Sequence, residues 1–371
     1  MRVIVMGGAG DMGSKAVEDL AISEGTTHVT IADRNIEGAR AIAARLAGKG
    51  ASVDVKAVDA NNHGELVAAM KGHDVAASAL GPFHRFEAKL VRAAVEAGVH
   101  YASICDEWDA AQAVFDQYDE PAKKAGVTVV TCLGASPGAT SIGFRLLHDE
   151  FDSVKCVDVY CYQPLDAGGG AAVIQHMLYI MTGEIAVWRG GKRIMVKALS
   201  EQRTIEFPKY GRIKLWNMGH AEPMTIPRFF PKIDEVNFFM GYGTAAEAIV
   251  YPAKWGFFTT PSRVDMGTKV LLAVEKITHK PEPAWGSLRI DVQGIKDGRP
   301  AQRTLCGIGQ MREVTGLSLS IGTQMLAKGQ LTVTGGGVYA PEACFDPKVA
   351  VAAFKAKGIQ VFEDVGMTKP F

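Results

Sequence analysis

The sequence predicts an α/β protein that begins with a Rossmann domain, a doubly wound parallel sheet, and continues with a second α+β domain. Three observations lead to this prediction. An apolar strand-like segment at residues 2–6 runs directly into the motif Gly8-x-Gly10-x-x-Gly13. A second strand-like segment ends on Asp33, 20 residues after Gly13. Strand-like and helical segments then alternate to about residue 150, as expected for parallel strands joined by helices.

The glycine motif is the pattern with which Rossmann domains bind the pyrophosphate of a dinucleotide. Gly8 permits the tight turn after the strand, Gly10 lets the backbone approach the phosphates, and Gly13 lets the helix pack against the strand. The N-terminus of that helix then directs free N–H groups at the phosphates. We therefore expect the cofactor to contact these glycines together with Asp11 and Met12.

The end of the second strand leaves the choice between NAD and NADP open. Asp33 favours NAD, because an acid there bonds the ribose hydroxyls and repels a 2′-phosphate. Arg34 can instead pair with that phosphate or stack on the adenine. We expect NAD, with NADP as the alternative, and we add Asp59, after the third strand, as a candidate cofactor contact. A nicotinamide cofactor implies hydride transfer.

Six strands and the helices between them complete the predicted sheet. The strands are expected at residues 2–6, 28–32, 52–58, 74–79, 100–103 and 127–131. Helices are expected, for instance, at residues 11–22, 36–46, 86–97 and 108–125. Because ligands bind beyond the carboxyl ends of such strands, the loops that follow the strands form the candidate site.

The loop after the fourth strand carries the first candidate catalytic residue. Its backbone is expected to run beneath the nicotinamide ribose, through Ala79, Leu80, Gly81 and Pro82. His84 begins the next helix, where an imidazole can exchange a proton with a substrate amine. Capping of that helix, or a bond to a backbone carbonyl, is an equally good interpretation of His84.

The loops after the fifth and sixth strands carry further candidates. Asp106 is the alternative proton-transfer residue, although it also suits a helix N-terminus. Gly134 and Ala135 are expected to face the cofactor, next to a helix N-terminus that can bind a carboxamide or a carboxylate. Arg312, near a late helix start, is a candidate clamp for a substrate carboxylate, with surface ion pairing as the alternative.

The second half of the chain predicts an α+β domain for substrate binding or dimerisation. Residues 154–162 are expected to form a strand, residues 171–185 a helix, and residues 288–295 and 302–308 a hairpin around an Asp-Gly turn. His176 is interpreted as a core or interface histidine. The expected ranges are 1–135 for the dinucleotide-binding domain, 136–345 for the substrate and dimerisation domain, and 346–371 for a C-terminal helix and strand packed on the body.

Composition excludes several classes of partner. Lys+Arg and Asp+Glu both total 40, and no segment concentrates basic residues, so we expect a small-molecule substrate rather than nucleic acid or an acidic membrane surface. Six cysteines without a CxxC pair, and no secretory signal, favour a reducing cytoplasm. No apolar run is long enough to span a membrane, and the nine histidines show no metal-site spacing, so no metal is expected.

Several motifs together resemble the saccharopine dehydrogenase-like family. They are the N-terminal glycines, Gly81-Pro82-Phe83-His84, Gly134-Ala-Ser-Pro137-Gly138, Val314-Thr315-Gly316 and the stretch 337–342. The layout is most similar to that of lysine 6-dehydrogenases. The resemblance implies a mixed sheet in the second domain, often a dimer, and oxidation of a C–N bond to an imine with NAD(P), or the reverse. It also implies that Phe83 and Ser136 face the substrate, where saccharopine reductases carry Tyr and Asp.

These observations predict an NAD(P)-dependent oxidoreductase of amino-acid metabolism. It would transfer hydride between nicotinamide and the C–N carbon of an amino acid or an amino-acid conjugate. Two alternatives remain open: a dehydrogenase or reductase of a C–OH group on the same fold, and a dinucleotide-binding sensor without catalysis. Saccharopine itself is doubtful as the substrate, because the departures from the family pattern fall on substrate-facing positions.

Overall fold

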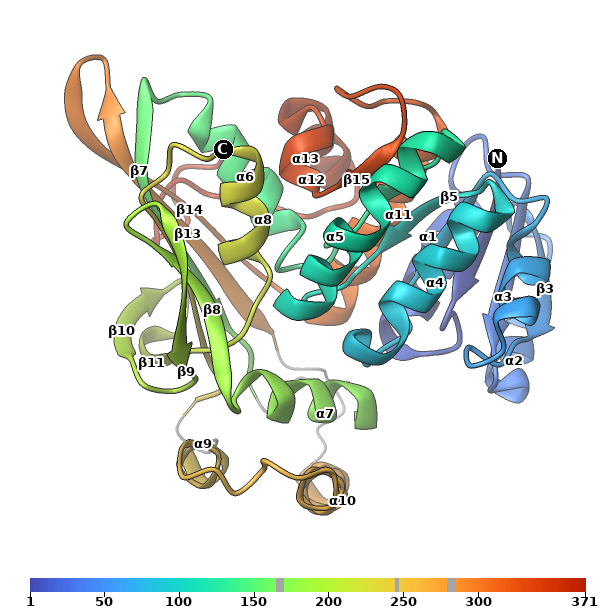
Figure 1. Ribbon diagram of the computed structural model, residues 1–371, viewed down its shortest axis with the longest axis horizontal. Coiled ribbons are helices and arrows are strands. Elements are labelled where there is room, and N and C mark those ends of the chain that lie inside the picture. The colour runs from blue at the N-terminus through green and yellow to red at the C-terminus, as the bar shows by residue number, and fades with distance from the viewer. Residues whose placement is uncertain (165–169, 244–246, 279–284) are drawn as a thin grey trace. The chain divides into compact units, whose positions relative to one another are not determined.

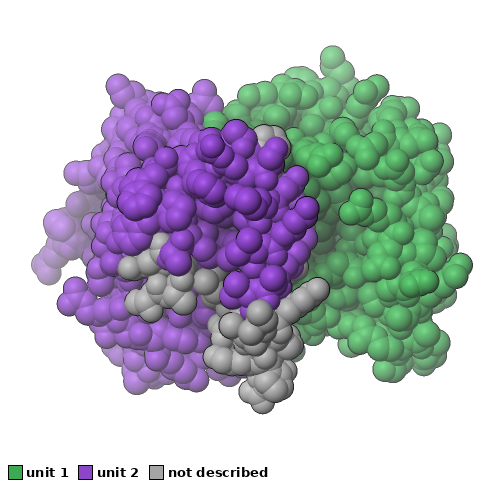
Figure 2. All heavy atoms as spheres, turned by 90° about the horizontal axis from the view of Figure 1, so that it is seen from below, with its two compact units in different colours: residues 1–142, 312–357 green, residues 143–311, 358–371 purple. Residues whose placement is uncertain are grey.

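The structure is a computed structural model that describes residues 1–164, 170–243, 247–278 and 285–371. The chain divides into two compact units, coloured separately in Figure 2. Unit 1 holds residues 1–142 and 312–357, and unit 2 holds residues 143–311 and 358–371. Within the described residues, no helix is both long and apolar enough to cross a membrane.

Unit 1 contains a parallel sheet of seven strands in the order β15-β6-β5-β4-β1-β2-β3. The strands are β1 (Arg2–Met6), β2 (His28–Asp33), β3 (Ser52–Ala57), β4 (Val75–Ser78), β5 (His100–Ser103), β6 (Thr128–Val130) and β15 (Gly337–Tyr339). Six of them are the predicted strands, in the order of a doubly wound Rossmann sheet. The central strands β1 and β4 consist almost entirely of buried residues, as expected for a sheet covered on both faces.

Helices connect the strands of this sheet. They are α1 (Asp11–Ile22), α2 (Ile36–Leu46), α3 (His63–Met70), α4 (Phe83–Ala97) and α5 (Trp108–Ala125). α4 packs against both α3 and α5, so these three helices lie side by side along the sheet (Figure 1). The predicted bounds of α1, α2 and α5 are confirmed, whereas α4 begins three residues before the predicted start at Phe86.

The last part of unit 1 comes from late in the chain. It comprises α11 (Met311–Ala327), β15, α12 (Pro341–Cys344) and α13 (Pro347–Ala356), with only Met311 of α11 assigned to unit 2. β15 pairs in parallel with β6 and extends the sheet. Ser320 of α11 donates a hydrogen bond of 2.7 Å to Asp19 of α1, and Lys357 lies 2.7 Å from the same carboxylate.

The compact units therefore divide the chain differently from the expected ranges. We expected residues 136–345 to form one domain and residues 346–371 to pack as a tail. Residues 312–345 instead belong to unit 1, because β15 completes its sheet and α11 bonds to α1. The tail is divided, with residues 346–357 in unit 1 and residues 358–371 in unit 2.

Unit 2 is built on a mixed sheet of eight strands. They are β7 (Ser153–Tyr162), β8 (Glu184–Arg189), β9 (Lys192–Lys197), β10 (Gln202–Phe207), β11 (Gly211–Asn217), β12 (Glu235–Gly241), β13 (Gly286–Lys296) and β14 (Arg299–Gly309). The main path runs β10-β11-β12-β7-β13-β14, and β8 pairs with both β12 and β9. β12 and β7 are parallel while the other pairs are antiparallel, which confirms the mixed sheet.

The helices of unit 2 are α7 (Gly170–Ile180), α8 (Glu222–Phe229), α9 (Glu247–Lys254), α10 (Pro261–Thr278) and most of α6 (Ala139–His148). The predicted hairpin is confirmed as β13 and β14, with Asp297 and Gly298 both at positive φ in the turn. The helix expected at 171–185 is too long, since α7 ends at Ile180 and the chain turns at Gly183 into β8.

Candidate active site

The glycine loop between β1 and α1 has the geometry of a phosphate-binding turn. Gly7 adopts φ +72°, and a Cβ there would lie 3.1 Å from the backbone of Ala79 in the loop after β4. A Cβ added at Gly13 would lie 2.2 Å from the carbonyl oxygen of Gly7, so only glycine lets α1 begin this close to the turn. Gly8 and Gly10 also lie in this turn, where Gly10 donates a hydrogen bond to Gly7. The loop therefore fits the pyrophosphate of a dinucleotide.

Asp33 lies at the end of β2, beside this loop. One carboxylate oxygen accepts a 3.0 Å hydrogen bond from the backbone N–H of Ala9, and the other accepts a 2.9 Å bond from Asn35. These bonds fix the carboxylate next to the turn, where a ribose would lie in a Rossmann domain. Arg34 is exposed, and Asp59 is exposed after β3, where it accepts a hydrogen bond from the backbone of Asn61.

At the carboxyl ends of the parallel strands, which form one edge of the sheet, backbone hydrogen bonds link the loops to neighbouring strands. The loops after β4, β5 and β6 each donate to the last residue of the strand beside them, β1, β4 and β5 respectively. The bonds are Ala79 to Met6 (3.0 Å), Ile104 to Ser78 (3.1 Å) and Leu133 to Ser103 (2.7 Å). Unit 1 thus brings together the predicted cofactor loops, which include Leu80, Gly81 and Pro82 after β4 and Gly134 and Ala135 after β6.

His84 lies in the first turn of α4, directly after this edge. Its Nδ1 is 2.8 Å from a carboxylate oxygen of Glu107, and the side chain is 31% exposed. Glu107 also accepts hydrogen bonds from the backbone N–H groups of Phe83, at 3.2 Å, and of His84, at 2.5 Å. His84 is therefore held by a carboxylate from the loop between β5 and α5.

Glu107 was not among the residues predicted from the sequence. It lies between Asp106, a named candidate, and the start of its own helix, where an acid suggests ordinary capping. Its side chain is instead fully buried and caps α4 rather than α5. A start of α4 at Phe83 rather than Phe86 would have indicated this capping role. The sequence does not show that start, because the cap comes from the Glu107 carboxylate itself.

The other predicted substrate residues have structural contacts of their own. Phe83 is buried at the start of α4, and Ser136 accepts a hydrogen bond from Thr140 at 3.4 Å. Arg312 donates to Ser14 and lies 3.1 Å from Asp11, a predicted cofactor residue next to Met12. Burial raises the pKa of Asp11, and the Arg312 guanidinium opposes that shift. This geometry is the ion pairing that the sequence left open for Arg312.

A second buried carboxylate lies one helical turn beyond His84. Glu87 accepts hydrogen bonds from the hydroxyls of Tyr101 (2.9 Å), Thr131 (3.2 Å) and Ser103. Complete burial raises the pKa of Glu87 to about 7, and the three hydroxyls oppose that rise. Glu87 thus ties α4 to β5 and to the end of β6.

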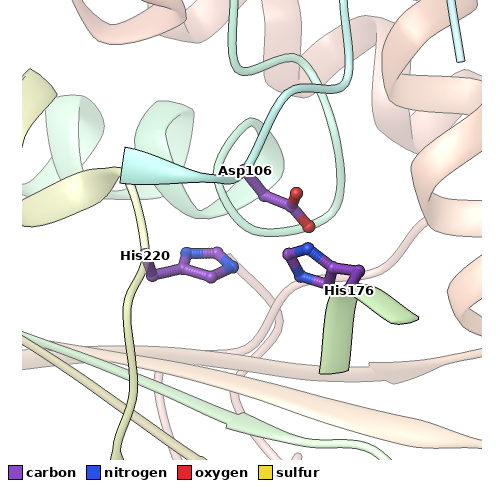
Figure 3. A group of neighbouring side chains, drawn as sticks. All are labelled: Asp106, His176 and His220. Carbon is purple, nitrogen blue, oxygen red and sulfur yellow. The ribbon is translucent and has the colours of Figure 1, made fainter. Parts of the chain in front are cut away.

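Unit 2 brings together two histidines that are 44 positions apart. A ring nitrogen of His176, on α7, lies within 4.8 Å of one of His220 (Figure 3). The backbone of Gly219 donates a 2.9 Å hydrogen bond to Ile180, one turn after His176, which holds the two segments together. His220 is buried, stacks on Phe238 at 3.7 Å and is bonded through Nδ1 to Glu222. Asp106, also labelled in Figure 3, belongs to unit 1.

The histidines show no metal-site spacing in the sequence, but the fold brings these two together. Two imidazoles at this separation can hold a cation or share a ligand's proton, and a carboxylate behind one ring is typical of such sites. The spacing in the sequence gives no hint of the pair, because the loop before α8 approaches α7 only in the folded chain.

Comparison with known proteins identifies the cofactor unit. Residues 3–130 match the family described as the saccharopine dehydrogenase NADP binding domain. Carboxyaminopropylagmatine dehydrogenase of Synechocystis is 23% identical over the whole of both chains. Saccharopine dehydrogenase (L-Glu forming) from Saccharomyces cerevisiae shares the fold, with a TM-score of 0.69 over 96% of this chain and 98% of the other, at 14% identity.

Residues 3–130 therefore belong to the saccharopine dehydrogenase NADP binding domain family, and the whole chain is similar to saccharopine dehydrogenase-like proteins in sequence and fold. These findings support an NAD(P)-dependent dehydrogenase. Two further likenesses each cover only about a third of this chain and of the relative's own length. Carboxynorspermidine synthase of Vibrio cholerae is 26% identical over 38% of this chain and 34% of its own length. A trans-acting enoyl reductase of Mycobacterium tuberculosis is 26% identical over 36% and 32%.

Proposed function

We propose that this dehydrogenase oxidises a secondary amine in an amino-acid conjugate, or forms it by reducing the corresponding imine. The observation that carries the proposal is the position of His84, partly exposed on the edge that also bears the glycine loop. The likeness to carboxyaminopropylagmatine dehydrogenase over both whole chains supports an amine substrate. The enoyl reductase likeness covers only 36% of this chain and 32% of the reductase, so it does not favour a different bond.

In the oxidative direction, the carbon that bears the nitrogen loses hydride and a C=N bond forms. A bound nicotinamide supplies the hydride acceptor. The amine must first be neutral, because an ammonium has no lone pair to help expel hydride. His84 accepts that proton and releases it to solvent. It then takes a proton from the water that adds to the C=N carbon and returns it to the nitrogen as the C–N bond breaks, which gives a carbonyl compound and an amine. Asp106 is the alternative acceptor.

The test is a reductive assay with NADH or NADPH, a panel of 2-oxo acids and aldehydes, and amines that include lysine and agmatine. We expect oxidation of the reduced cofactor only when carbonyl and amine are both present. In His84→Ala, kcat should fall about 100-fold, the usual contribution of proton transfer by a side chain. His63→Ala is the control, because His63 pairs with Glu96 on the exposed surface of unit 1.

Two results would contradict the proposal. Turnover of a hydroxy acid or a sugar without any amine would favour the C–OH alternative. Tight dinucleotide binding without turnover of any substrate, unaffected by His84→Ala, would favour the sensor. The similarity in layout to lysine 6-dehydrogenases and the cytoplasmic location both stay predictions.

For the cofactor we propose NAD rather than NADP. The carboxylate of Asp33, held by Ala9 and Asn35, would lie against a 2′-phosphate. Asp33→Ser should raise the ratio of kcat/KM for NADP over NAD by about tenfold or more, since one like-charge contact is worth at least ~1.4 kcal/mol. Steady-state kinetics with both cofactors measures the ratio. A wild type that already prefers NADP would contradict the assignment and agree with the name of the matching family.

We also propose a homodimer that forms through α10. Met266, Val270 and Val274 are 47%, 56% and 48% exposed, and their spacing places them along one side of the helix. α10 also packs against α7, and Gly267 lies against Phe258 and Leu178. A helix that packs on its own unit and still exposes an apolar row is typical of one that a further partner covers.

A further inference from the structure

Glu107 has three contacts with the first turn of α4 and is fully buried. Its carboxylate accepts the backbone N–H groups of Phe83 and His84 and lies 2.8 Å from Nδ1 of His84. The N-cap residue of α4 is Pro82, whose side chain makes no capping hydrogen bond. The loop after β5 therefore supplies the cap that α4 does not supply itself.

This position favours the ionised carboxylate. The first N–H groups of a helix have no partner within the helix and carry the positive end of its dipole. Two of these donors point at Glu107, and hydrogen bonds to the charged form of an acid stabilise that form. An ionised carboxylate can only accept hydrogen bonds, so the proton between it and the imidazole belongs to Nδ1 of His84.

We propose that Glu107 is a positioning residue that fixes the tautomer of His84. With the proton on Nδ1, the neutral ring has its lone pair on Nε2, which is then the nitrogen that takes a proton from the substrate amine. The carboxylate also balances the positive charge that the ring acquires when it accepts this proton, as an acid behind a catalytic histidine does elsewhere. This inference rests on the role proposed for His84.

The deciding variant is Glu107→Gln. Its amide oxygen can still accept a backbone N–H, but its NH₂ group can donate to Nδ1 and so favours the opposite tautomer. We expect kcat to fall about 100-fold with KM for both substrates nearly unchanged, as for the loss of a correctly protonated base. ¹⁵N NMR of the histidine ring should show Nδ1–H in the wild type and Nε2–H in Glu107→Gln.

Glu87→Gln is the matched control. Glu87 is as buried as Glu107 and lies on the same helix as His84, but it bonds to Tyr101, Ser103 and Thr131 rather than to His84. It should leave the His84 tautomer and kcat unchanged. A double-mutant cycle separates direct from indirect action: Glu107→Gln should cost nothing further once His84 is alanine.

The outcomes separate this inference from the proposed function. If His84→Ala keeps full activity, the role of His84 fails, while the NMR of the wild type and of Glu107→Gln still tests the tautomer. A wild-type ring with the proton on Nε2, or a loss in Glu107→Gln that adds fully to that of His84→Ala, would overturn the inference. If Glu107→Gln does not fold, the wild-type spectrum alone decides.

Discussion

At the residue scale, unit 1 places two buried carboxylates at α4: that of Glu107, from the loop before α5, against its first turn, and that of Glu87, within the helix, a turn later. Glu107 bonds to backbone N–H groups and to an imidazole, whereas Glu87 bonds to three hydroxyls. Hydroxyls can accept as well as donate, so the second site tolerates a protonated acid. Complete burial raises the pKa of Glu87 to about 7, above its ordinary value of 4.5, although the three hydroxyls oppose that rise.

The raised pKa of Glu87 predicts how stability depends on pH. Because the folded chain binds this proton more tightly than the unfolded chain, the free energy of unfolding should fall as pH rises from about 4.5 to about 7, and then level off. The fall amounts to about 3 kcal/mol at ~1.4 kcal/mol per pKa unit. Urea unfolding of the wild type and of Glu87→Gln between about pH 5 and pH 8 measures it.

Glutamine does not titrate, so Glu87→Gln should lack this fall while keeping the remaining pH dependence of the protein. The pH-dependent contribution of Glu87 is the free energy of unfolding of the wild type minus that of Glu87→Gln, and this signed difference should fall as pH rises toward about 7. Parallel curves across the whole range would show that Glu87 has the same proton affinity in the folded and unfolded chains.

The candidate residues differ in how far sequence alone could select them. His84 was predicted because it follows a strand of a recognisable sheet, and loops after such strands approach the ligand. Glu107 was missed because its partners lie 23 and 24 positions away, on another helix. Local spacing shows which residues can cap their own helix, but it carries no information about a cap supplied from another segment.

At the element scale, local signals predicted the parallel sheet well. In residues 1–131, short apolar runs typical of strands alternate with segments whose apolar residues have helical spacing, and glycines and short turns separate them. Their order therefore follows from the sequence. The Asp297-Gly298 turn likewise predicted its hairpin, because few dipeptides adopt positive φ at both positions. The error at α7 has a local cause too, since the apolar run continues past Gly183 into a strand.

The late elements show where local signals end. β15 has only three residues, and it is a strand because β6 offers an open parallel edge beside it. α11 was predicted as a helix, but nothing in its own pattern assigns it to unit 1 rather than unit 2. That assignment comes from its polar bonds with α1, through Arg312 and Ser320.

At the scale of the whole molecule, the chain leaves the cofactor unit at residue 142 and returns to it at residue 312. An interrupted unit of this kind cannot be recognised from composition, because both segments are ordinary α/β sequence. The return also explains why the family match ends at residue 130 although the unit continues in residues 312–357. The cofactor unit is complete only when both segments are present.

The proposed dimer gives the last prediction. A two-fold axis pairs the same surface from two copies, so an apolar side of α10 is complementary to itself in antiparallel packing. Val270, 56% exposed and central among the three residues, would then meet the partner copy near the axis. Val270→Glu places two carboxylates close together there, and we expect it to convert a dimer into a monomer in light scattering coupled to gel filtration.

Ile22→Glu is the control for a general effect of replacing an exposed apolar side chain by an acid. Ile22 is 58% exposed at the end of α1, in unit 1, and its replacement should leave the dimer intact. Both variants should keep the unfolding temperature of the wild type within a few degrees, because neither side chain is buried in its own unit. A wild type that is monomeric at micromolar concentration would contradict the dimer. A Val270→Glu variant that stays dimeric would contradict an interface at α10.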